Sequence, residues 1–90
     1  MTLREFKALS AQEMFKKLGY KQTQNGKYFI KYVDYTDKHV KYEITFCKFM
    51  SCVEITPKLN GEEFGFTRLD KHLLIAINKQ LEEMEKDEDE

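Results

Sequence analysis

The chain has 90 residues, a formal net charge of −1 and 41% hydrophobic residues, among them seven Phe and five Tyr. A chain this short cannot support two independent cores, and one Pro with this many aromatic residues excludes a disordered or linker-like composition. The longest apolar run is Leu73–Ile77, far short of the roughly 20 residues that cross a bilayer, and the first residues lack a signal-peptide core. We therefore expect one soluble cytoplasmic domain that makes no contact with a membrane.

The charge is unevenly divided along the chain. Residues 82–90 contain seven acids and one lysine, a net of −6, which leaves +5 on residues 1–81. Like-charge blocks at a chain end are usually solvated. We therefore assign residues 1–84 to the domain and residues 85–90 to an acidic, frayed tail. Alternatively, the tail is a mobile anion that covers a basic surface.

Capping patterns predict helical structure in the first twenty residues. Ser10-Ala11-Gln12-Glu13 has the form of a capping box, in which the first hydroxyl accepts the amide of the fourth residue. Gly19 supplies the left-handed residue that commonly closes a helix, so we expect this helix to end at Leu18. Thr2-Leu3-Arg4-Glu5 repeats the capping pattern and predicts a further turn or two of helix before it.

Alternation of apolar and polar residues predicts four antiparallel strands. Asn25-Gly26 is a strong signal for a type I′ hairpin turn, because both residues of that turn need positive φ. Pro57 is expected to end the last strand by withholding a hydrogen-bond donor. The expected strands cover Tyr20–Thr23, Lys27–Tyr35, Val40–Cys47 and Ser51–Thr56.

The pairing of these strands is predicted by matching their apolar faces, since a slip of one residue turns a whole face to water. We expect Ile30 opposite Ile44, which also places Lys31 opposite Glu43, and we expect Ile44 opposite Ile55. The predicted core combines sheet and helix residues: Tyr28, Ile30, Tyr42, Ile44, Phe46, Val53, Ile55, Phe15, Leu18, Leu73, Ile77 and Leu81.

The last predicted helix completes the fold. Thr67 and Asp70 have the spacing of a helix start, so the helix should begin near Arg68. Its acidic last turn lies against the negative end of the helix dipole, which predicts fraying beyond Met84. The expected fold is α+β with the order α-β-β-β-β-α: a meander of three to four antiparallel strands flanked by an N-terminal and a C-terminal helix.

Metal-binding chemistry is weakly supported. Cys47, Cys52, His39 and His72 are the zinc-type ligands, but the cysteines are loosely spaced and each histidine stands alone. On the expected strands the two cysteines flank a hairpin turn and could approach each other. We predict two reduced thiols, no metal and no cofactor.

Catalytic patterns are also weak. Asp34, Asp37 and His39 share a turn and could form an acid-base cluster, although aspartate is common in turns because it bonds nearby amides. The sequence has no nucleophile elbow and no glycine loop of the kind that binds phosphate. We predict that the protein is not an enzyme.

The predicted binding face is the side of the sheet that points away from the predicted core. It combines aromatic and charged residues: Phe29, Lys31, Val33, Tyr35, Lys41 and Glu43. Exposed aromatic residues beside charges are typical of protein interfaces, so we predict a protein-interaction module whose partner is another protein or a second copy of the chain. The alternative is a weak nucleic-acid binder, because rings can stack on bases while lysines contact phosphate, with the acidic tail as competitor.

Two resemblances bear on function. The order of elements is similar to the double-stranded RNA-binding domain, but where that family opens its last helix with a Lys-Lys-x-Ala-Lys type motif this chain has Thr67–His72, so no function is carried over. The stretches Phe15–Tyr20, Tyr28–Tyr35 and Ala76–Glu83 resemble small proteins of unknown function encoded by phages and prophages of low-GC Gram-positive bacteria. The resemblance implies a non-enzymatic accessory protein in a bacterial cytoplasm.

Overall fold

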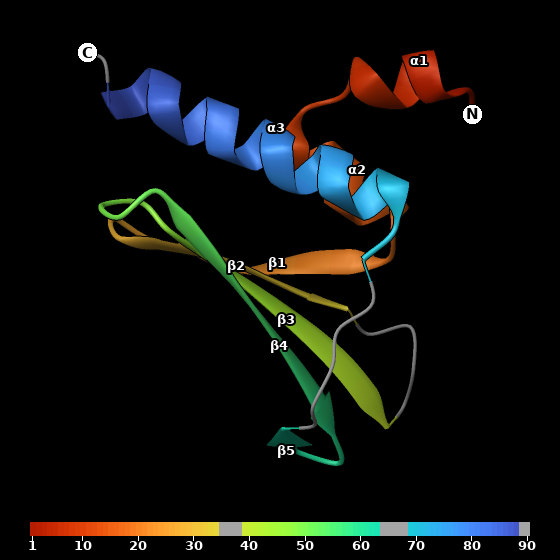
Figure 1. The fold of residues 1–90 in the computed structure, drawn as a ribbon, viewed down its shortest axis with the longest axis vertical. Coiled ribbons are helices and arrows are strands. Elements are labelled where there is room, and N and C mark those ends of the chain that lie inside the picture. The colour runs from red at the N-terminus through yellow and green to blue at the C-terminus, as the bar shows by residue number, and fades with distance from the viewer. Residues whose placement is uncertain (35–38, 64–68, 89–90) are drawn as a thin grey trace.

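The protein is an α+β domain in which helices cover one face of a five-stranded sheet (Figure 1). The computed structural model describes residues 1–34, 39–63 and 69–88. All neighbouring strands are antiparallel and follow chain order, so the sheet is the predicted meander with one additional short strand. In chain order the elements are α1 (Leu3–Lys7), α2 (Ala11–Lys17), β1 (Tyr20–Asn25), β2 (Phe29–Asp34), β3 (Val40–Cys47), β4 (Cys52–Leu59), β5 (Glu62–Glu63) and α3 (Lys71–Glu88).

The first two helix starts confirm the capping patterns. The side chain of Thr2 accepts the amide of Glu5, and Ser10 Oγ accepts the amide of Glu13. Gly19, which follows the C-cap residue Leu18, adopts a φ of 92°, the left-handed conformation that closes a helix without a steric penalty.

The third helix starts later than predicted. The amide of Leu73 donates to Asp70 Oδ1 over 2.8 Å, so Asp70 caps α3 and the helix begins at Lys71, not near Arg68. The proposed start residues Thr67 and Arg68 lie outside the described residues. At its other end α3 continues to Glu88, past Met84, so the first residues of the expected tail are helical. Fraying of these residues in solution stays a prediction.

The Asn25-Gly26 turn was predicted wrongly. β1 and β2 form a hairpin, but Asn25 pairs with Ile30, which leaves a loop of four residues, and neither Asn25 nor Gly26 has positive φ. The amide of Gly26 instead donates to the carbonyl of Phe29 over 2.9 Å. An Asn-Gly pair permits the left-handed conformation but does not enforce it, and here a wider loop forms.

The second Asn-Gly pair makes the tight turn. Asn60 and Gly61 have φ values of 52° and 89° and connect the paired residues Leu59 and Glu62, as a two-residue type I′ hairpin requires. β4 therefore does not stop at Pro57, which lies inside the strand opposite Tyr42. Proline is tolerated near a sheet edge, where its nitrogen needs no ladder partner.

One of the two predicted registers is confirmed and the other is shifted. Ile44 lies opposite Ile55 as predicted, but Ile30 lies opposite Phe46 and not opposite Ile44, a shift of two residues. A shift of two keeps every side chain on its predicted face, which is why alternation alone cannot detect it. The shift places Tyr28 beyond the ladder, where its side chain is exposed, so its assignment to the core was wrong.

The core lies between the helices and the sheet. Ile30, Ile44, Phe46, Phe15, Leu73 and Ile77 are buried as predicted, while Tyr42, Val53, Ile55, Leu18 and Leu81 are partly buried and pack around them. At its centre the rings of Phe15 and Tyr32 stack with centroids 4.1 Å apart. The predicted core list lacked several buried residues: Phe6, Ala11, Met14, Tyr20, Tyr32, Ala76 and Met84.

Candidate binding surface

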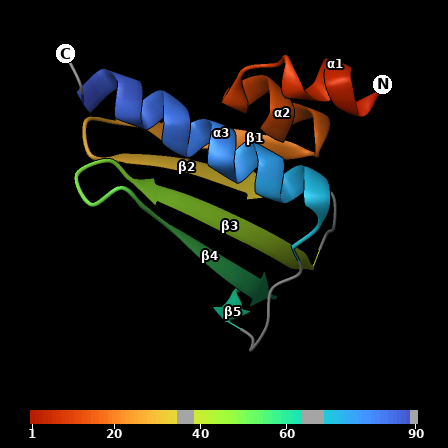
Figure 2. The same ribbon diagram turned by 45° about the horizontal axis from the view of Figure 1, so that its top comes forward.

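The predicted binding face lies on the side of the sheet that the helices leave uncovered (Figure 2). Phe29 and Lys41 are exposed there, and Lys31 and Glu43 are partly buried. Val33 shares this face but is only 4% exposed, so it offers a partner almost no surface. Tyr35 lies outside the described residues.

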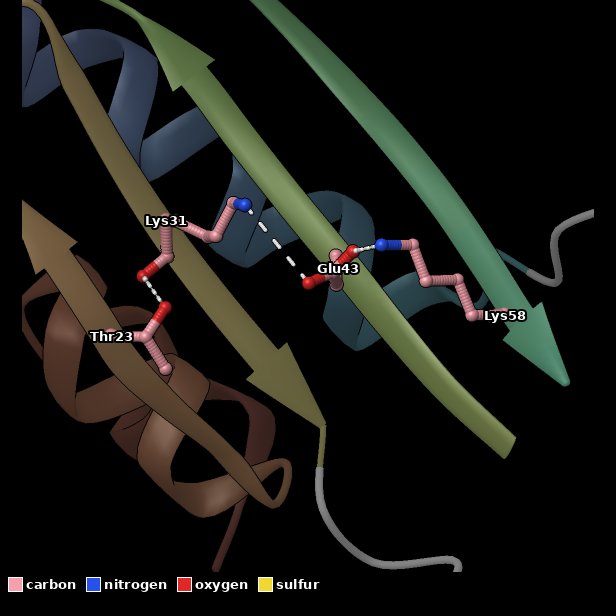
Figure 3. Close-up of polar contacts among 4 residues, drawn as sticks. All are labelled: Thr23, Lys31, Glu43 and Lys58. Atoms are coloured by element: carbon pink, nitrogen blue, oxygen red, sulfur yellow. Dashed lines mark hydrogen bonds and ion pairs between the residues drawn. The ribbon is translucent and has the colours of Figure 1, made fainter. Parts of the chain in front are cut away.

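At the centre of this face Glu43 binds two lysines (Figure 3). Glu43 Oε2 is 2.7 Å from Lys58 Nζ, and Glu43 Oε1 is 4.0 Å from Lys31 Nζ. Lys31 and Glu43 are diagonal neighbours and not the direct pair that was predicted, because Val33 stands opposite Glu43. The hydrogen bond to Glu43 raises the pKa of Lys58. The Glu43 carboxylate therefore offsets part of the positive charge of these lysines, which weakens the middle of the open face as a phosphate-binding surface.

Four exposed apolar side chains gather at the two hairpins, where the predicted binding face ends at Phe29. Tyr28 and Phe29 come from the β1–β2 hairpin, Phe49 and Met50 come from the β3–β4 hairpin, and these four are between 39 and 66% exposed. The ring of Phe49 stands edge-on to the rings of Tyr28 and Phe29, with centroids 6.0 and 6.1 Å apart. We call this cluster of four residues the hairpin-tip patch.

A backbone hydrogen bond joins the two hairpins beneath the patch. The amide of Lys48 donates to the carbonyl of Tyr28 over 2.8 Å, so the loops hold a fixed relation to each other. Lys27 Nζ lies 5.5 Å from the centroid of the Tyr28 ring, a distance suited to a cation-π contact. The patch is thus a preformed aromatic surface with lysines beside it.

The acidic end of α3 lies at the same end of the molecule as the two hairpin turns (Figure 1). Glu83 and Met84 of α3 line one shallow cavity together with Asn25 and Lys48 of the hairpins. Glu83, near the acidic end of α3, therefore lines the same cavity as Lys48, the sequence neighbour of Phe49 in the hairpin-tip patch.

The polar groups inside the helix–sheet interface satisfy one another. The hydroxyl of Tyr32 donates to Gln80 Oε1 over 2.7 Å and accepts from Gln22 Nε2 over 3.2 Å. Burial raises the pKa of Tyr32 to about 12, so this hydroxyl stays protonated at neutral pH. Glu83 Oε2 accepts the amide of Ala11 over 2.7 Å and ties α3 to the start of α2. These contacts give Tyr32, Gln80 and Glu83 a structural role.

The residues considered for acid-base or metal chemistry lie in several parts of the fold, and one of them, Asp37, lies outside the described residues. His39 Nδ1 lies 3.1 Å from Asn60 Oδ1. His72 packs its ring edge-on against Phe6. Within residues 1–34, 39–63 and 69–85, no three His, Cys, Asp or Glu side chains gather as they would around a metal ion. Cys47 and Cys52 do stand opposite each other, and both are free thiols.

No protein-family model, curated protein or solved structure matches this chain. The resemblance to phage and prophage proteins therefore stays a prediction. In the part of the chain that the structure describes, each helix is too short or too polar to cross a membrane.

Sequence reasoning missed most of the hairpin-tip patch, although a signal was present. Phe49 and Met50 stand side by side in a four-residue loop between two strands, a position where polar residues are usual. Two large apolar residues in such a loop favour an exposed contact surface when the strands around them already supply a complete apolar face.

Proposed function

We propose that the protein is a non-enzymatic interaction module that binds a partner protein through the hairpin-tip patch. The observation that supports this is the gathering of four large apolar side chains, 39 to 66% exposed, on two hairpins tied together by a hydrogen bond. Aromatic residues and Met are enriched in protein interfaces, and covering them recovers about 25 cal/mol for each Å² removed from water. A preformed patch also loses little conformational entropy on binding.

The chemistry of the patch defines the partner surface. Four apolar side chains need an apolar pocket, while Lys27 and Lys48 beside them favour carboxylates around the rim of that pocket. In keeping with the resemblance to phage and prophage proteins, the partner we propose is a bacterial host protein that an accessory factor would bind or inhibit.

The proposal is tested by using the immobilised wild type and its variants to capture proteins from a bacterial lysate. The amount of each protein that the variants recover is compared with the amount that the wild type recovers. Phe49→Ala should reduce recovery of the specific partner at least about tenfold, because central aromatic residues carry much of an interface's binding energy. Leu74→Ala is the matched control, since Leu74 is an exposed apolar residue on α3, away from the patch. Equal recovery of the same proteins by the wild type and Phe49→Ala would exclude the patch as the binding site.

A second candidate is binding of single-stranded nucleic acid by the same surface. The observation in its favour is that Lys27 and Lys48 adjoin three exposed rings, since rings stack on bases and ammonium groups contact phosphate. The rings pack edge-on against one another, however, which leaves fewer free ring faces for bases. We therefore place the protein partner first.

A further inference from the structure

Two free cysteines face each other at the base of the β3–β4 hairpin. Cys47 ends β3 and is the direct ladder partner of Cys52, which begins β4. The neighbouring thiol of Cys47 is among the groups that raise the pKa of the Cys52 thiol. Opposed residues of an antiparallel ladder have Cα atoms about 4.5 to 5.5 Å apart, and disulfides usually span about 4.4 to 6.8 Å. The backbone therefore already holds these residues at a separation that a disulfide can bridge.

The two thiols differ in their access to solvent. Cys52 is exposed, whereas Cys47 is buried on the same face of the sheet beside it. A reagent in solution reaches Cys52 first, and Cys47 is placed to react next. This is the arrangement of an attacking and a resolving thiol.

We propose that Cys47 and Cys52 are a site of reversible thiol–disulfide exchange, at which a small-molecule disulfide of the oxidised-glutathione class forms a cross-strand disulfide. The thiolate of Cys52 attacks one sulfur of the small disulfide and expels the other sulfur as a thiolate. The thiolate of Cys47 then attacks the sulfur of Cys52 in the mixed disulfide and expels the second small thiolate. The two protein thiols lose two electrons and two protons, and the small disulfide becomes two thiols.

The surroundings of Cys52 set the pace of this exchange. Local desolvation, the neighbouring Cys47 and the charge of Glu54 raise the pKa of the Cys52 thiol. Because the thiolate is the attacking species, the raised pKa slows exchange at neutral pH relative to a cysteine with an unshifted pKa.

The bond would close the loop that carries Phe49 and Met50, since these residues lie between the two cysteines. The chemical inference does not rest on the proposed function, because bond formation is measured on the protein alone.

The test incubates the reduced full-length protein with excess oxidised glutathione, followed by alkylation of free thiols and measurement of the intact mass. We expect a monomer that has lost two hydrogen atoms, carries no glutathione and no alkyl group, and reverts to two thiols with dithiothreitol. Closing this short loop should raise Tm by about 5 to 10 °C. A persistent glutathione adduct, a disulfide-linked dimer or two unreacted thiols would each overturn the proposal.

A matched control keeps two thiols but changes their placement. In the double variant Cys52→Ser with Glu54→Cys, the second thiol stands on the same exposed face but opposite Thr45. Its Cα is then a diagonal neighbour of Cys47, about 7 to 8 Å away and outside the usual range for a disulfide. The control should form at least about tenfold less internal disulfide than the wild type at equal times. Equal bridging in both proteins would show that the cross-strand position of Cys52 is not what directs the reaction.

Discussion

Ile44 and Thr45 are adjacent residues of β3 that face opposite sides of the sheet. Ile44 is 0% exposed within the core, whereas Thr45 is partly exposed on the open face opposite Glu54. Ile44→Ala removes buried carbon atoms and leaves a cavity, which should cost about 2 to 5 kcal/mol. Thr45→Ala should cost less than about 1 kcal/mol, because no core packing is lost. Urea unfolding of both variants measures the difference, and equal losses would mean that the faces of β3 are assigned wrongly.

Residue patterns do not predict which of two tyrosines near β2 is buried. Alternation places Tyr28 and Tyr32 on the same side of one strand, and nothing local distinguishes them. Tyr32 is buried with its ring stacked on Phe15, and its hydroxyl bonds Gln22 on a neighbouring strand and Gln80 on α3. Tyr28 is exposed because the loop takes it out of the ladder. Which tyrosine belongs to the core therefore depends on distant contacts that the sequence does not display.

At the scale of elements, the two Asn-Gly pairs provide a matched experiment on turn geometry. Gly61 has a φ of 89° with open space around it, so Gly61→Ala is opposed by backbone strain alone, and we expect a loss of about 1 kcal/mol. Gly26 lacks positive φ and its added Cβ would meet atoms only at 3.9 and 4.0 Å, so Gly26→Ala should be neutral or stabilise by up to about 1 kcal/mol. Urea unfolding gives the change in unfolding free energy for both variants. Hydrogen exchange at the Asn60 amide, which donates to the carbonyl of His39, reports strain that is confined to the β4–β5 turn. A larger loss of stability for Gly26→Ala than for Gly61→Ala would indicate that the tight turn lies at Asn25-Gly26.

Elements were predictable where their causes are local. The starts of α1 and α2 follow from side chains at Thr2 and Ser10 that reach amides three residues ahead, and Gly19 closes α2 through its own φ. The pairing of β2 with β3 and the passage of β4 through Pro57 depend on neighbouring strands instead. A shift of two residues and a proline near an edge both keep the apolar faces intact, so the sequence pattern could not separate these alternatives.

At the scale of the whole molecule, the charge of the chain is unevenly divided. The sequence shows +5 on residues 1–81 and −6 on residues 82–90, but not how far apart these blocks lie. In the structure the C-terminal end of α3 and the hairpin turns occupy one end of the molecule (Figure 1), and Glu83 shares a cavity with Lys48. Whether the acids beyond Glu83 lower the positive potential around the hairpin-tip patch is a question that their removal answers.

Removing the end of α3 separates the two candidate functions. Deleting residues 85–90 takes away five acids and one lysine and changes the net charge from −1 to +3. If the patch binds single-stranded nucleic acid, the truncated protein should bind about two- to tenfold more tightly at low salt, because the competing anions are gone. Affinity should then fall with salt at a log-log slope of about −0.7 for each phosphate neutralised. Fluorescence anisotropy of a labelled single strand measures both effects.

Phe49→Ala in the truncated protein should weaken binding, since it removes a stacking ring without changing charge. If neither form binds at protein concentrations up to about 100 μM in low salt, the nucleic-acid function is excluded.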